Sequence, residues 1–175
     1  PPTRPEVLVT TSDGGGQGTP VTVRTAVPAK AEDFLVGLEQ ASGVPPVDED
    51  ERRRLAGLRP ARDPGWRWTA HLVLAGERPV AYAGIRVDDH ARPGEACTAR
   101  VDLAFDRAPG VAQRALGAAL EHVRDHATVQ DESGTTPRLE AWLRGATAED
   151  LATAGAHGFA EHRRLHVLGV RTDAV

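Results

Sequence analysis

One segment constrains the fold of this chain more than any other, because it predicts a helix between two strands. Apolar residues recur at helical spacing in a stretch without proline, at Leu116, Leu120, Val123 and Ala127. Alternating apolar residues predict a strand before it, over 97–105, and another after it, over 139–143. A helix that connects two strands of one sheet crosses over that sheet, so these two strands should run parallel.

The remaining segments predict a mixed α/β (α+β) fold with six to seven strands, largely antiparallel, and about four helices. Further strands are expected over 19–25, 69–75, 80–87 and 159–170. Further helices are expected over 31–38, after Asp48 and after Thr147. Asp48 and Thr147 are N-cap residues that are followed, three positions later, by the acidic residues Glu51 and Asp150.

Composition limits the function classes that this chain can serve. Hydrophobic residues make up 40% and charged residues 26% of 175 residues, which is the balance of one globular domain. The net charge of -4 argues against nucleic acid as a partner. No apolar run approaches the roughly 20 residues of a membrane helix, so we expect a cytoplasmic protein without a membrane partner.

Two further features concern domain organisation. Prolines and a run of glycines predict that residues 1–18 form a flexible arm or linker, which leaves 19–175 as the domain. Cys97 is the only cysteine, so neither an internal disulfide nor a cysteine-based zinc site can form. The fold must therefore be held together by packing.

The chemically most informative segment is 101–124, where a strand leads through small residues into a helix. Backbone N–H groups at such a helix start can bind a pyrophosphate. The segment Arg114-Ala115-Leu116-Gly117-Ala118-Ala119-Leu120 resembles the acyl-CoA loop of the GCN5-related N-acetyltransferases, with Ala115 in place of one glycine. A second register, over 107–112, also fits the loose formula of the family, but it would start the helix earlier.

Other segments agree with this resemblance in order and spacing. Residues 19–38 resemble the opening strand and helix of the family, 139–145 its fifth strand, and 154–159 its closing Gly-Phe turn. Residues 42–47 and 71–79 are most similar to the N-terminal half of the two-domain mycothiol synthases of actinobacteria.

The resemblance implies a sheet that splays open between its fourth and fifth strands to admit acetyl-CoA, with no metal. Backbone groups of the fourth strand would receive the thioester, at Leu103, Ala104 and Phe105. Amides of the following turn would bind the pyrophosphate, at Gln113, Arg114, Ala115, Leu116, Gly117 and Ala118. The implied reaction is direct attack by a primary amine of a small molecule, and a second such domain or a homodimer is left open as a partner.

Asp102 is the best candidate for the general base, because relatives often carry an acidic residue on the fourth strand; Glu95 and Glu140 are weaker candidates, and a solvated carboxylate is the alternative for Asp102. The family often protonates the leaving thiolate with a tyrosine, and Ala154 occupies that place, while Tyr82 is expected to pack. The departures at Ala112, Ala115 and Ala154 favour an alternative function: a catalytically degenerate domain that serves as the structural or regulatory half of a two-domain acetyltransferase.

Several other residues are open to two interpretations. His122 and His126 have the spacing of a metal clip on a helix, but no third ligand has a natural spacing, so surface positions are expected. Trp66 and Trp68 are expected to pack, with an interface or substrate rim as the alternative. A surface role is likewise preferred over a site role for Arg52, Arg53, Arg54, His162 and His166. Cys97 could carry an acyl group only with a base beside it, so this role is not favoured.

Overall fold

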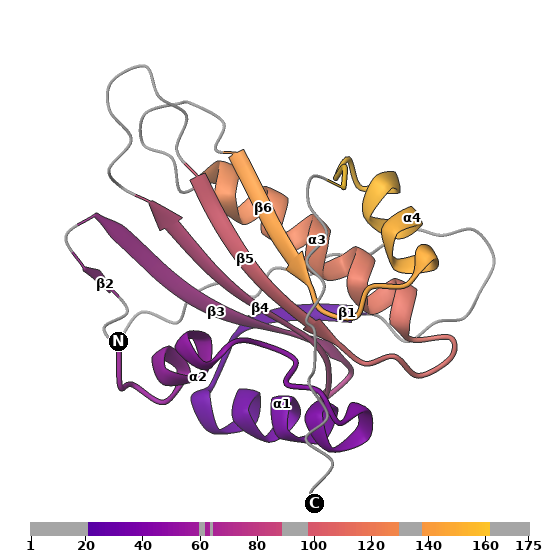
Figure 1. Ribbon diagram of the computed structural model, residues 1–175, viewed down its shortest axis with the longest axis horizontal. Coiled ribbons are helices and arrows are strands. Elements are labelled where there is room, and N and C mark those ends of the chain that lie inside the picture. Colours follow the sequence, from indigo (N-terminus) through magenta and orange to yellow (C-terminus); the bar gives the residue numbers. More distant parts are fainter. Residues whose placement is uncertain (1–20, 60–61, 64, 89–97, 130–137, 162–175) are drawn as a thin grey trace, which may run out of the picture.

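The structure, a computed structural model, describes residues 21–59, 62–63, 65–88, 98–129 and 138–161. The elements follow one another along the chain as β1 (Val21–Thr25), α1 (Pro28–Ser42), α2 (Glu49–Leu55), β2 (Arg62–Asp63), β3 (Trp66–Ala75), β4 (Arg78–Asp88), β5 (Thr98–Phe105), α3 (Ala112–Val129), β6 (Arg138–Leu143) and α4 (Ala148–Ala156) (Figure 1). The mixed α/β architecture predicted from the sequence is confirmed.

The six strands of the described residues form one sheet in the order β1-β3-β4-β5-β6, with the short β2 paired to β3. All neighbours are antiparallel except β5 and β6, which are parallel and are connected by α3. The parallel crossover predicted from 97–143 is therefore confirmed. The β5–β6 ladder ends at the pair Leu103 and Leu143, so β5 extends past β6 by Ala104 and Phe105.

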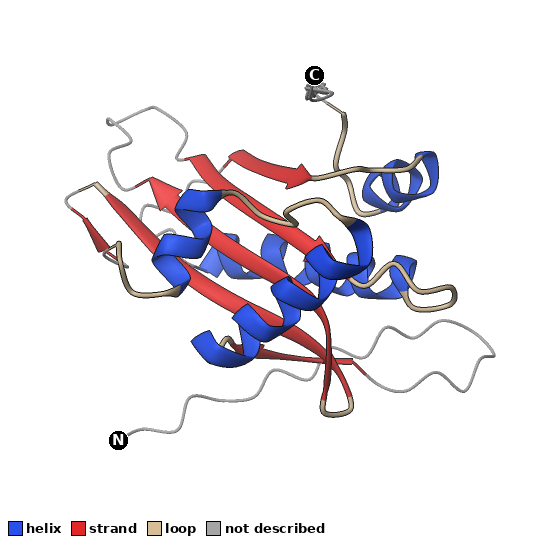
Figure 2. Ribbon diagram, turned by 60° about the horizontal axis from the view of Figure 1, so that its bottom comes forward, coloured by secondary structure: helices blue, strands red, loops and turns tan. Residues whose placement is uncertain are grey.

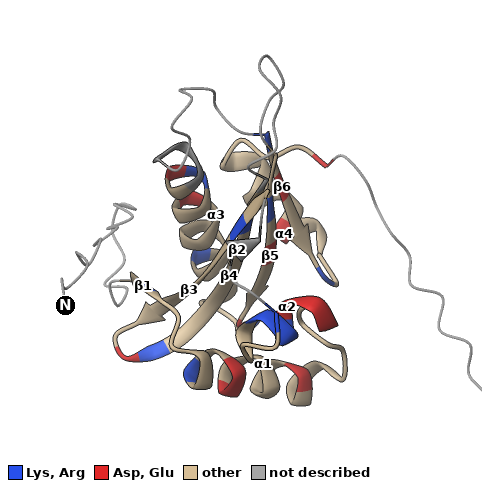
Figure 3. Ribbon diagram, turned by 90° about the vertical axis from the view of Figure 1, so that its left-hand side faces the viewer, with Lys and Arg blue, Asp and Glu red and all other residues tan. Residues whose placement is uncertain are grey.

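Helices cover both faces of the sheet. Figure 2 shows α1 and α2 in front of the strands with α3 behind them, and Figure 3 shows the same layers edge-on. Strand alternation assigns side chains to the two faces. On β5, Val101, Leu103 and Phe105 join the core beneath α3, whereas Ala104 joins the core beneath α1 and α2. Asp102 therefore faces the α1/α2 side.

The helix ends show why these segments fold locally. Asp48 caps α2 by accepting a hydrogen bond from the Glu51 amide at 2.7 Å. Thr147 and Asp150 form a reciprocal capping box at α4. Gly43 ends α1 with φ of 72°, a conformation that favours glycine. Both predicted N-caps are confirmed.

Two predictions fall wholly or mainly outside the described residues. The arm over 1–18 lies there, as does most of the strand predicted over 159–170; its described part, 159–161, is not in a strand. Within the described residues, none of the helices is both long enough and apolar enough to cross a membrane.

Candidate functional site

A polar cavity of about 460 Å³ lies between α2 and the adjoining face of β4, β5 and β6. Charged residues gather on α2 and on the strands beside it (Figure 3). The lining residues are Asp48, Asp50, Glu51, Arg54, Gly84, Arg86, Arg100, Asp102, Glu140, Trp142 and Arg144. Acidic and basic side chains thus share one partly open cavity, which is where carboxylates with unusual proton affinity are expected.

Asp102 lies half-buried on β5, opposite Gly84 of β4 and Trp142 of β6. Burial, and then the negative charge of Asp48, raise the pKa of Asp102 to about 6, against the opposing effect of Arg144. A carboxylate with this pKa is mostly ionised at neutral pH and still binds a proton more readily than an ordinary aspartate. Asp102 is therefore not a freely solvated strand residue.

Glu51 is a second carboxylate of the cavity, and it comes from α2 rather than from the sheet. It is only 4% exposed. Its Oε1 accepts a hydrogen bond from the Tyr82 hydroxyl at 2.6 Å, and both carboxylate oxygens lie 3.0 Å from Trp68 Nε1. Burial raises the pKa of Glu51 to about 7, although these two donors act to lower it.

Gly84 makes room for this carboxylate. A Cβ atom built at Gly84 would overlap the carboxylate of Glu51. Because Gly84 has no side chain, the carboxylate of Glu51 on α2 can reach Tyr82 and Trp68 on the sheet.

Sequence analysis did not identify Glu51 as a site residue, because its position three residues after Asp48 indicated a cap. The cap is only half formed: the Glu51 amide bonds to Asp48, while the Glu51 side chain turns to the sheet. The usable signal was the pair Trp68 and Tyr82, two donors on neighbouring strands, of which Tyr82 is fully buried and Trp68 partly buried, and both need an acceptor.

The raised pKa of Glu51 predicts a pH-dependent stability. Between the ordinary value of 4.5 and about 7 the folded chain binds more protons than the unfolded chain, so the free energy of unfolding falls as pH rises. Relative to Glu51→Gln, the wild type should lose about 2–3 kcal/mol between about pH 4 and pH 8. Denaturant unfolding of both proteins over this range measures the difference.

The exposed residue Glu49 on the same helix provides a matched control. Glu49→Gln removes a carboxylate from the exposed side of α2 and shows how much of any stability change comes from the loss of negative charge on this helix alone. A wild-type–Glu51→Gln difference that is constant over the pH range would show that Glu51 does not titrate as described.

The corner between β5 and α3 differs from the preferred sequence register. The helix α3 begins at Ala112, and the Ala115 amide already donates to Val111 O at 2.9 Å. Ala115, Leu116, Gly117 and Ala118 therefore lie inside the helix, where backbone amides are used by the helix itself. The segment 107–112, the second register, is what occupies the turn.

The side chains of this corner also show that Ala115 to Ala118 do not form a phosphate-binding turn. A Cβ atom at Gly117 would lie 2.9 Å from His157 Nε2, so Gly117 lets α3 pack closely on α4. Ala115, Leu116 and Ala118 are buried in the core beneath α3. Of the residues predicted to bind pyrophosphate, only Gln113 and Arg114 lie in the first turn of the helix, where amides lack intrahelical acceptors.

Arg107 and Gln113 connect this corner to α4. Arg107 donates to the buried Asp150 at 2.7 Å and to Arg144 O at 3.0 Å, and its guanidinium lies 4.5 Å from the ring centre of Phe105. Gln113 donates to Asp150 at 3.2 Å. These bonds hold the turn in place beside Ala104 and Phe105, the end of β5 that extends past β6 while it stays paired with β4.

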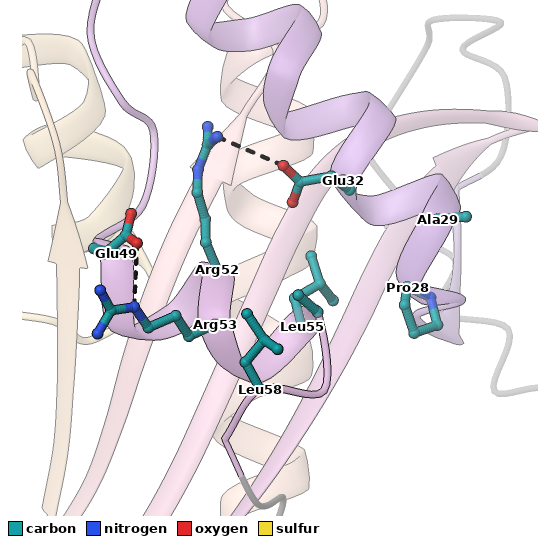
Figure 4. Close-up of a pocket in the computed structure, with 9 residues that line it drawn as sticks. Pro28, Ala29, Glu32, Glu49, Arg52, Arg53, Leu55 and Leu58 are labelled. Atoms are coloured by element: carbon teal, nitrogen blue, oxygen red, sulfur yellow. Dashed lines mark hydrogen bonds and ion pairs between the residues drawn. The ribbon is translucent and has the colours of Figure 1, made fainter.

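A second hollow, of about 390 Å³, lies between α1 and α2 (Figure 4). Its charged side chains pair with one another: Arg52 lies 3.5 Å from Glu32, and Arg53 lies 3.2 Å from Glu49. Arg54 faces inward instead, where it pairs with Asp50 and lies 4.3 Å from the Trp66 ring centre. The surface role expected for the three arginines thus applies to Arg53, is partial for half-buried Arg52, and is wrong for Arg54.

The structure also places the remaining candidates. Glu140 lies on β6 in the polar cavity, 3.5 Å from Arg138 and 3.9 Å from Arg100. Trp68 packs against the core beneath α1 and α2, as expected, and Ala154 is buried beneath α3. Other candidates lie outside the described residues: Glu95, Cys97, His162 and His166.

Comparison with known proteins gives matches among solved structures alone. No protein-family model and no curated protein sequence matches the chain. Glucosamine-6-phosphate N-acetyltransferase from Arabidopsis thaliana is similar with a TM-score of 0.54 and 11% identity, over 85% of this chain and 97% of that one. An aminoglycoside antibiotic 6'-N-acetyltransferase from Acinetobacter baumannii is similar with a TM-score of 0.51 and 13% identity, over 86% and 98%.

An acetyltransferase from Trypanosoma brucei is similar with a TM-score of 0.50 and 17% identity, over 86% of this chain and 99% of that one. In each of the three cases nearly the whole of the neighbour matches this chain. The chain therefore has the fold of the GCN5-related N-acetyltransferases.

Proposed function

We propose that this chain is an N-acetyltransferase that transfers an acetyl group from acetyl-CoA to a primary amine of a small molecule. The observation that carries the proposal is Asp102, a half-buried carboxylate with a pKa of about 6 on the strand that extends past the parallel ladder. Asp102 lines a cavity that is large enough for a small amine acceptor. The fold shared with acetyltransferases supports the assignment.

The proposed reaction is a direct transfer. The amine nitrogen attacks the thioester carbonyl, a C–N bond forms, and the C–S bond breaks. Asp102 accepts the proton that the amine loses, and the thiolate takes a proton from water, because Ala154 offers no acidic group. Protonated Asp102 then returns its proton to the hydroxide, so the step leaves no net charge behind. Ionised Asp102 also attracts the acceptor in its ammonium form, which gives one proton to solvent before it attacks as the neutral amine. The second carboxylate of the cavity, Glu51, lies on the same side of the sheet.

The donor would lie at the corner between β5 and α3. Ala104 and Phe105 have no partner strand on the β6 side among the described residues, so their backbone groups can receive a thioester. The first-turn amides of Gln113 and Arg114, with the guanidinium of Arg107 close by, suit a diphosphate. Of the remaining predicted contacts, Leu103 is already paired with Leu143 in the β5–β6 ladder, and Ala115 to Ala118 do not fit for the reasons given above.

A second candidate function follows from that partial fit. The amide of Ala115 is already bonded, and buried Ala154 replaces an acidic side chain. These features suit a degenerate domain that binds acetyl-CoA weakly and serves as the structural or regulatory half of a larger acetyltransferase. Its partner would then be a second domain of this fold or a second copy of the chain.

Two measurements distinguish the candidates. Acetyl-CoA is titrated calorimetrically into the chain, and release of free thiol is followed with a panel of small primary amines. Binding with turnover supports the transferase, and binding without turnover supports the degenerate domain. Absence of binding at millimolar acetyl-CoA would contradict both.

The site of the diphosphate is tested with Pro109→Glu. Pro109 is exposed in the turn that precedes α3, so the substitution adds a negative charge without disturbing the core. Repulsion should weaken acetyl-CoA binding about tenfold, which is the effect of roughly 1.4 kcal/mol. Calorimetric titration measures the change.

Gln40→Glu adds the same charge at an exposed position of α1 and serves as the control. Equal affinities for Pro109→Glu and Gln40→Glu would move the diphosphate away from this turn.

A further inference from the structure

Three histidines meet on the face of the sheet opposite the polar cavity. His71 lies on β3 and points to the same face as Val73, toward α3, while His122 and His126 lie one turn apart on α3. Figure 3 shows α3 alongside this face, away from α1 and α2. One ring nitrogen of each histidine lies within 4.8 Å of the other two.

The three rings are close and partly withdrawn from solvent. The ring centre of His71 lies 4.6 Å from that of His122 and 4.6 Å from that of His126, and His71 is 8% exposed. The Thr69 hydroxyl lies between two of them, 3.2 Å from His71 Nε2 and 3.4 Å from His126 Nε2. His71, His122 and His126 therefore form a packed, partly buried cluster rather than a set of surface residues.

His122 has an unsatisfied nitrogen in this cluster. Its Nε2 is buried and has no hydrogen-bond partner among the residues that the structure describes. A buried polar atom left in this way costs about 1–3 kcal/mol, so such atoms usually serve a purpose.

We propose that His71, His122 and His126 form a binding site for a divalent transition-metal ion, with Zn²⁺ the best match. Imidazole nitrogens favour zinc, copper, nickel and cobalt over magnesium and calcium. Tetrahedral zinc with three nitrogen ligands needs them about 3.3 Å apart, so the ring nitrogens must approach by at most about 1.5 Å. Small side-chain rotations achieve this, and the fourth position stays available to water or to the nearby Thr69 hydroxyl.

This proposal differs from the sequence expectation of no metal. His122 and His126 lacked a third ligand at any natural spacing, and the fold supplies it from β3, a distant part of the chain. Because the site joins β3 to α3 on the far side of the sheet, a bound ion would stabilise the packing of that helix. It would not enter the proposed transfer reaction, so the two proposals stand independently.

The test uses the full chain, freed of metal with a chelator and titrated with Co²⁺, which gives visible absorption bands in tetrahedral sites. One Co²⁺ per chain is expected to produce these bands. Metal at about 100 times its Kd should also raise Tm by about 5–10 °C, and a chelator should reverse this rise. A chain that shows neither bands nor a Tm rise would overturn the proposal.

Variants assign the binding to these residues. His122→Gln should lose the bands and the Tm rise while its metal-free Tm stays within a few degrees of the wild type, because it removes an unsatisfied nitrogen. His126→Gln provides a second test if His122→Gln does not fold. His157→Gln, which changes a histidine at the end of α4 outside the cluster, should keep both responses. A metal response retained in the cluster variants would overturn the assignment.

Discussion

Asp102→Asn is expected to lower kcat/KM for the amine about 10²–10⁴-fold, the usual effect of removing a general base. Asparagine keeps the shape of the side chain but cannot accept a proton from the attacking amine. Affinity for acetyl-CoA should be unchanged, because Asp102 lies in the cavity beneath α2 and not at the turn that precedes α3. Steady-state kinetics of thiol release, with calorimetric titration of acetyl-CoA, separate the two effects.

The pH profile provides a second, independent readout. With the pKa of Asp102 at about 6, the wild-type kcat/KM should fall as pH drops below that value, since the protonated carboxyl is no longer a base. Asp102→Asn should lack this part of the profile, while the ionisation of the acceptor amine affects both proteins alike. Glu140→Gln is the matched control, because Glu140 lines the same cavity but is ion-paired with Arg138 and Arg100. Similar losses in Asp102→Asn and Glu140→Gln would contradict the role of Asp102 as the base.

Local patterns were enough to predict most of the fold. The spacing of Leu116, Leu120 and Val123 predicted α3, and its place between two strands predicted their parallel pairing. The caps at Asp48 and Thr147 use short-range hydrogen bonds, which sequence spacing records directly. The start of α3 was misplaced, because Ala112 and its neighbours favour helix more than the glycines of the family loop do.

The candidate site was less predictable, because it depends on contacts between distant residues. Asp102 could be selected from its place on a strand, whereas Glu51 joins it only because α2 folds over the sheet. The histidine cluster shows the same limit, since His71 meets α3 only through the packing of β3. The spacing of residues along the sequence indicates which side chains are neighbours within one helix or strand. Both of these contacts join different elements, so spacing could not predict them.

Gly84→Ala is expected to destabilise the fold by about 3–5 kcal/mol. The new methyl group would overlap the carboxylate of Glu51 and force it out of its place on the sheet. The buried Tyr82 hydroxyl would then lose its acceptor, at about 1–3 kcal/mol, and the partly buried Trp68 would lose the same acceptor, with further strain from overpacking. Denaturant unfolding measures the loss, with Gly37→Ala as the control: Gly37 lies in α1 with open space around it, so alanine there should stabilise by about 0.5–1 kcal/mol.

A double-mutant cycle connects this loss to Glu51. Glu51→Ala alone removes the acceptor of Tyr82 and Trp68 and leaves a void beside Gly84. In the double variant the methyl group added by Gly84→Ala occupies part of that void and no longer meets a carboxylate. The two single losses should therefore sum to about 1–3 kcal/mol more than the loss of the double variant. Strict additivity would mean that Gly84 matters for its backbone alone, and that the carboxylate of Glu51 does not depend on the space beside β4.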